Sequence, residues 1–266
     1  MRKETLGVLT GLSLILAACG GAAGAETVDD DDPVLQIVSE GGFVPVEMAL
    51  SNGPRYTLLG DGQLIHQGFS TLEYPGALLP PYLVARLDRN QMGSILAMVE
   101  RIGLPEMTDE HDDTAMNTIA DASTEVITYW DRVGAHRYSV YALGIQEQPS
   151  ERNAAFLEVV ETLDQFVAGA DAETYQPARV RVIALADAFV DPAFSDVRDW
   201  PLDDNWGEWE ELANGSTCRV LGPEVLEIFG DATQATTWEI PDTSGYSAPV
   251  RLLVRPLHPG EPDCPS

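Results

Sequence analysis

Carboxylates and tryptophans are the side chains best able to do chemistry in this chain, and they concentrate in two stretches. The first is an acidic loop at residues 106–113, with Glu106, Asp109, Glu110, Asp112 and Asp113. Carboxylate oxygens are the ligands that hard cations prefer, but calcium needs about six or more converging oxygens. The loop also lacks the ligand spacing and central glycine of an EF-hand. We therefore expect a solvated loop and no cofactor, the alternative being a metal site formed by Asp109, Glu110, Asp112 and Asp113.

The second stretch, residues 199–211, combines aspartates with Trp200, Trp206 and Trp209. Exposed tryptophans beside carboxylates suit a sugar or a cationic surface, and tryptophan is a frequent interface anchor. Alternatively, the three rings fix the loop onto a small core, where a large aromatic side chain buries much area. Because a long loop without secondary structure needs anchors, we favour the second interpretation and keep ligand contact as the other.

Catalytic motifs are scarce. A carboxylate pair such as Asp204 and Glu208 could serve a glycosidase, but the chain holds 43 acidic residues, so choosing a pair is close to chance. There is no Gly-x-Ser-x-Gly, no lysine after Lys3 for a Ser–Lys mechanism, and no phosphate loop or dinucleotide fingerprint. The four histidines are scattered: His66, His111, His136 and His258. These absences favour a non-catalytic protein over a carboxylate-dependent hydrolase.

Strand and helix patterns alternate up to residue 169. Apolar runs predict strands at 34–38, 44–48, 55–59, 63–66, 125–130 and 136–141. Gly60-Asp61-Gly62 predicts a hairpin turn. A helix over 88–102 is expected to begin with an Asp88–Gln91 capping box, and a second helix runs over 150–167. This order predicts an α+β domain at 33–169, with an antiparallel sheet and two helices on one face.

A linker at 170–177 and a smaller α+β unit at 178–266 are expected to follow. Its predicted strands are 179–185, a short one around Trp238, and 250–255. Pro223 is well placed in a first helical turn, with Leu226 and Phe229 facing inward.

The beginning of the chain has the pattern of an export signal. Met1-Arg2-Lys3 precedes an apolar run at 6–18, which is shorter than the roughly 20 residues of a membrane helix. Leu16-Ala17-Ala18-Cys19 resembles the lipobox of bacterial lipoproteins. The resemblance implies a signal peptide at 1–18, diacylglycerol on Cys19, a tether at 19–32 and a location outside a bacterial membrane. The alternative is an uncleaved helix over 5–25, which the Gly- and Ala-rich half at 20–25 disfavours.

Residues 43–167 are similar to a group of uncharacterised bacterial envelope domains. The matching residues are Pro54-Arg55-Tyr56-Thr57-Leu58, Gly60-Asp61-Gly62 and Asp121. The resemblance implies a fold and no activity.

Charge and cysteines limit the partners further. A formal charge of −28 disfavours nucleic acid and anionic lipid, and favours cations or a basic protein. With Cys19 lipidated, Cys218 and Cys264 are most simply a disulfide in an oxidising compartment, the alternative being two buried thiols. We therefore expect a lipid-anchored, non-catalytic binding module with a basic protein or a carbohydrate as partner.

Overall fold

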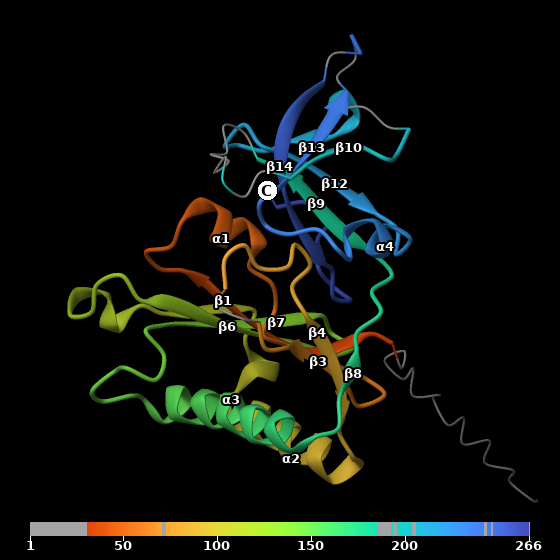
Figure 1. Ribbon diagram of the computed structural model, residues 1–266. Helices are drawn as coiled ribbons and strands as arrows, with labels where there is room; N and C mark the ends of the chain where they lie inside the picture. Colours follow the sequence, from red (N-terminus) through yellow and green to blue (C-terminus); the bar gives the residue numbers. More distant parts are fainter. Residues whose placement is uncertain are drawn as a thin grey trace, which may run out of the picture.

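The computed structural model describes residues 31–70, 73–185, 193, 196–203, 206–241, 244–245 and 247–265, without the side chains of residues 206, 247 and 248. Two sheets form the molecule, an eight-stranded one and a six-stranded one (Figure 1). In spatial order the first sheet contains β5 (Asp109–Asp112), β7 (Ala135–Tyr141), β6 (Ser123–Trp130), β1 (Pro33–Gly41), β2 (Tyr56–Leu59), β3 (Gln63–Gln67), β4 (Tyr82–Arg86) and β8 (Glu173–Thr174). Neighbouring strands are antiparallel, except β5 and β7.

Two helices, α2 (Arg89–Ile102) and α3 (Glu151–Gly169), cover one face of this sheet (Figure 1). Both begin as the sequence predicts. The Asp88 side chain accepts hydrogen bonds from the first turn of α2 while Gln91 accepts one from the Asp88 amide, and Ser150 caps α3. Gly103, at φ 80°, ends α2 in the left-handed conformation that glycine adopts without strain. The predicted α+β fold, with two helices on one face of a largely antiparallel sheet, is confirmed.

Two local predictions are wrong. Residues 44–48 do not form a strand, because α1 (Val46–Ser51) is a helix that follows Pro45, which has no N–H for a sheet and a φ of −54°. In the expected loop at 106–113, residue 106 ends the short helix η1 (Leu104–Glu106), residues 109–112 form strand β5, and η2 (Thr114–Asn117) follows. Within the expected linker at 170–177, β8 pairs with β4.

The second sheet contains β10 (Asp196–Asp199), β13 (Thr236–Pro241), β14 (Ser247–Pro256), β9 (Val180–Ala184), β12 (Thr217–Leu221) and β11 (Glu210–Glu211), with η4 (Trp206–Glu208) and α4 (Val225–Phe229) beside them. The strands predicted at 179–185, around Trp238 and at 250–255 are therefore confirmed. Phe229 and Trp238 lie in the core of this unit, as does Val225.

A buried polar layer joins the two sheets on the face of the first sheet opposite α2 and α3. The hydroxyl of Thr57 lies 2.8 Å from Nδ1 of His258, and the Tyr82 ring packs edge-on against the same imidazole at 4.6 Å. Tyr175 donates a 3.0 Å hydrogen bond to the carbonyl of Leu257. Residues 257 and 258 thus connect the C-terminal segment with the first sheet.

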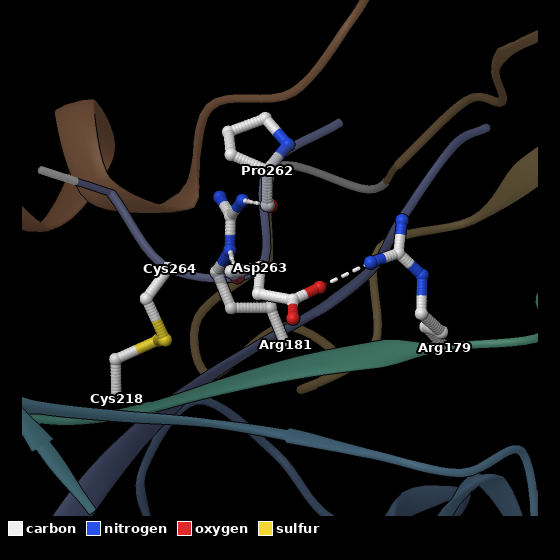
Figure 2. Close-up of a disulfide and its surroundings, with 6 residues drawn as sticks. All are labelled: Arg179, Arg181, Cys218, Pro262, Asp263 and Cys264. Atoms are coloured by element: carbon white, nitrogen blue, oxygen red, sulfur yellow. Dashed lines mark hydrogen bonds and ion pairs between the residues drawn. A yellow bond between two sulfur atoms is a disulfide. The ribbon is translucent and has the colours of Figure 1, made fainter. Parts of the chain in front are cut away.

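Cys218 of β12 and Cys264 form the predicted disulfide, with their Cα atoms 6.0 Å apart. Beside it, Arg181 donates hydrogen bonds to the backbone carbonyls of Pro262 and Asp263, and Arg179 pairs with the Asp263 carboxylate (Figure 2). The C-terminal segment is therefore held both covalently and by arginine side chains.

Candidate binding groove

Helix α1 bridges the two sheets. It follows β1 of the first sheet in the sequence, yet it packs against β14 of the second. Glu47 accepts a 3.3 Å hydrogen bond from Arg251 of β14. Leu50 packs against the apolar cluster that contains Ile183 and Leu212. Two contacts with the second unit therefore fix a short helix that has little intrinsic stability of its own.

Several large apolar side chains on α1 and just before it are open to solvent. Met48 is 58% exposed and Val46 53%, while Phe43, just before the helix, is 89% exposed. Two further aromatic side chains are exposed after β3: Phe69 fully, and Tyr74 to 55%. Three of these residues, Met48, Phe69 and Tyr74, line one groove, and we call them the apolar rim. Because grouped exposed apolar side chains mark interaction surfaces, whereas scattered ones are normal, the rim is the strongest candidate for a binding site among the described residues.

A groove of about 940 Å³ lies between α1, the segment around residues 73–81 and β14. Met48 and Ser51 line it from α1, Tyr74 and Pro81 line it from the opposite segment, and residues 251–254 contribute from β14. Segments that are far apart in the sequence thus meet in one open depression, of the size expected for ligand sites.

A smaller pocket of about 420 Å³ continues the groove and shares Asn52, Gln67 and Phe69 with it. In this pocket, Arg55 donates to both carboxylate oxygens of Asp164, at 2.6 and 2.8 Å, and the Tyr56 hydroxyl donates to the same carboxylate. Burial and then the bond to Asp164 raise the pKa of Tyr56 to about 12. Tyr56 therefore keeps its proton at neutral pH and acts as a hydrogen-bond donor rather than as a base.

His66 lines the smaller pocket and is almost fully buried. Its Nδ1 lies 3.0 Å from the carbonyl oxygen of Gln67, which can only accept, so the imidazole proton belongs on Nδ1. Nε2 is then an acceptor, with no hydrogen-bond partner among the residues that the structure describes. The smaller pocket is thus lined both by polar groups, among them His66 and Asp164, and by the apolar side chain of Phe69.

The acidic residues that were the alternative metal ligands point in different directions. Glu110 pairs with Arg152 at 2.8 Å, and Asp112 accepts a 2.8 Å hydrogen bond from Asn153. Asp109 lies 3.4 Å from His111 instead, because alternate side chains of a strand face opposite sides. In the described parts of the chain, no three His, Cys, Asp or Glu residues are grouped as a metal site.

The tryptophans predicted as alternative ligand contacts are core residues where the structure describes them. Trp200 and Trp209 are buried, with ring centroids 5.7 Å apart, and both belong to the core that includes Trp238. Ligand contact through Trp200 and Trp209 is therefore wrong, and the expected anchoring of the loop is confirmed for these two. The side chain of Trp206 lies outside the described part of the chain.

Other expectations fall partly outside the described residues. Asp204 of the glycosidase-type pair is one such residue, while Glu208 pairs with Arg219 at 3.2 Å. Cys19 and the expected signal peptide also lie outside the described residues. Within the described chain, no helix combines the length and hydrophobicity needed to cross a bilayer.

No protein-family model, curated protein or solved structure matches this chain. The resemblances to a lipobox and to envelope domains therefore stay predictions.

The groove itself was missed from the sequence. The one available signal is the apolar run Phe43-Val44-Pro45-Val46, which follows Gly41-Gly42 and is interrupted by a proline. A buried strand would not carry that proline centrally, so the run could have been recognised as an exposed apolar segment.

Proposed function

We propose that this protein is a lipid-anchored, non-catalytic binding module of a bacterial envelope, and that its ligand binds in the groove beside α1. The observation that carries the proposal is the exposure of the apolar rim. Three large exposed side chains that line one groove favour a partner that covers them, because grouped exposed apolar groups mark interaction surfaces. The export signal and lipobox resemblance at residues 1–19 support the anchored location.

Electrostatics support binding over catalysis. A glycosidase-type acid needs a carboxyl group whose pKa is raised. Among the described carboxyl groups, those whose pKa departs from its ordinary value are all lowered: Asp61, Asp112, Asp131, Asp196 and Glu261. The carboxylate-dependent hydrolase is therefore the weaker proposal.

A peptide-display selection tests the groove. The full chain, held in phosphatidylcholine nanodiscs, is used to select binders from a random dodecapeptide library. Selected peptides are then tested on a Met48→Ser/Phe69→Ser double variant. A Val133→Ser/Ile145→Ser variant serves as matched control, because both of these residues are exposed and neither lines the groove.

The proposal predicts binders that lose about tenfold or more affinity on the groove variant and keep it on the control, as expected when apolar anchor residues are truncated. If every selected binder tolerates Met48→Ser/Phe69→Ser, the groove is not the binding site.

Lipid attachment is tested separately at Cys19. The wild-type chain should carry diacylglycerol by mass spectrometry and begin at Cys19, whereas Cys19→Ala should remain uncut and unlipidated. Acyl chains on the Cys19→Ala variant would disprove the anchor.

A further inference from the structure

We infer that the groove binds a segment of a partner protein that carries both apolar side chains and lysine or arginine. This inference rests on the proposed function and names the chemistry of its ligand.

The geometry favours a macromolecular segment over a small molecule. Small-molecule sites enclose most of the ligand surface in a concavity. Here the apolar groups that line the groove are themselves exposed: Phe69 fully, Met48 to 58% and Tyr74 to 55%. A ligand that covers them must extend over α1 and over the opposite segment, which is the manner in which protein interfaces bury anchor residues.

Charge determines which segment fits. The groove and the adjoining pocket contain three carboxylates, Glu47, Glu73 and Asp164. The two guanidinium groups beside them are already bound to two of those carboxylates, Arg251 to Glu47 and Arg55 to Asp164.

Glu73 lines the groove and is exposed, in a chain of net charge −28. An acidic segment would meet a surface with excess negative charge, whereas a basic one would be attracted to it.

The two kinds of contact have different roles. Burying the apolar rim supplies the affinity, since apolar area removed from water drives association. The carboxylates select among partners and accelerate the encounter, because exposed charge pairs contribute little to affinity at physiological salt. The apolar contribution should therefore resist salt, while the preference for basic segments should weaken as salt rises.

Three fluorescein-labelled dodecapeptides test these statements on the full chain in phosphatidylcholine nanodiscs. The first alternates Leu with Lys, the second Leu with Glu, and the third Ser with Lys. We expect the Leu–Lys peptide to bind about tenfold or more tightly than either of the others. Met48→Ser/Phe69→Ser should lower its affinity about tenfold, as expected for loss of two apolar anchors.

Glu73→Gln isolates the charge effect. It should weaken the Leu–Lys peptide by about two- to fivefold at low salt, the range for an exposed ion pair, and have a smaller effect at high salt. A neutral peptide that alternates Leu with Ser should be unaffected. Glu227→Gln is the matched control, because Glu227 is an exposed residue of α4 that does not line the groove or the smaller pocket.

The failures can be told apart. If the Leu–Glu peptide binds as tightly as Leu–Lys, and both depend on Met48 and Phe69, the groove binds peptides but the inferred basic chemistry is overturned. If no peptide responds to Met48→Ser/Phe69→Ser while the variant keeps its wild-type unfolding midpoint, the proposed function fails as well.

Discussion

Arg181 and Arg255 lie directly opposite each other on β9 and β14, and both are buried. Two buried like charges would oppose folding unless they were compensated. Glu261 compensates Arg255 through two 2.8 Å hydrogen bonds, and Arg181 donates to backbone carbonyls of the C-terminal segment. Burial, and then the neighbouring Arg255, lower the pKa of Arg181 to about 10. The C-terminal segment therefore supplies the carboxylate and the carbonyl oxygens that stabilise the two buried arginines.

Glu261→Gln should be strongly destabilising. It keeps the side-chain shape but removes the carboxylate that Arg255 needs, and an uncompensated buried charge costs about 3–5 kcal/mol. Urea unfolding monitored by tryptophan fluorescence measures the loss. Glu227→Gln, an exposed position, should stay within about 0.5 kcal/mol of wild type. A loss under 1 kcal/mol for Glu261→Gln would show that the pair is not needed.

Acidification should destabilise the fold through His258. Burial lowers the pKa of this imidazole from 6.5 to about 4, and Nδ1 is bonded to Thr57. Between these values the unfolded chain binds a proton that the folded chain does not, so stability falls as the pH drops from 6.5 towards 4. At about 1.4 kcal/mol per unit the decrease is about 3 kcal/mol.

His258→Asn should flatten this dependence when urea unfolding is measured from pH 7 to pH 4.5. His136 does not obscure the comparison. Its hydrogen bond to the Met107 carbonyl and its pairing with Asp131 raise the pKa of His136, so its contribution is complete below pH 6.5. Equal slopes for wild type and His258→Asn would assign the acid sensitivity to other groups.

Removing the disulfide should cost about 4 kcal/mol in the chain-entropy model, because Cys218 and Cys264 close a loop with a sequence separation of 46. Cys218→Ser/Cys264→Ser is compared with the wild type under oxidising and reducing conditions by urea unfolding. The reduced wild type should match the double variant. A double variant as stable as the oxidised wild type would mean that Arg179 and Arg181 alone hold the segment.

Asn153, buried on α3, should be the most sensitive polar side chain near the helices. It accepts from the Tyr138 hydroxyl at 2.6 Å and donates to Asp112 and Gln146 at 2.8 and 2.9 Å. Asn153→Ala leaves the buried hydroxyl without its acceptor, for a loss of about 2–3 kcal/mol. Exposed Asn117→Ala is the control in thermal unfolding, and equal midpoints for the two variants would contradict the network's importance.

Elements that encode their own boundaries could be predicted from the sequence. Asp88 with Gln91 begins α2, Gly103 ends it, and Gly60-Asp61-Gly62 turns the first hairpin, all through local hydrogen bonding or backbone preference. By contrast, β5 is a run of polar residues that becomes a strand only by pairing with β7. The two residues of β8 likewise form a strand through β4. Such pairings are tertiary and leave no local pattern.

The candidate site was less predictable than the fold. Val46 and Met48 fit a strand pattern as well as an exposed helix, and only the packing of α1 on β14 decides between them. The groove also needs three segments that are far apart in the sequence. Trp200 and Trp209 could be predicted as loop anchors because large aromatic residues are usually buried where a small core is available.

Hydrogen–deuterium exchange with the Leu–Lys dodecapeptide tests the central claim, that the groove beside α1 is the binding site. Addition of the peptide to the full chain in nanodiscs should slow amide exchange over residues 43–52 and 73–79. Exchange over 106–113, the acidic segment on the first sheet's edge, should be unchanged. Protection confined to 106–113, or saturating binding with no protection over 43–52, would contradict the account.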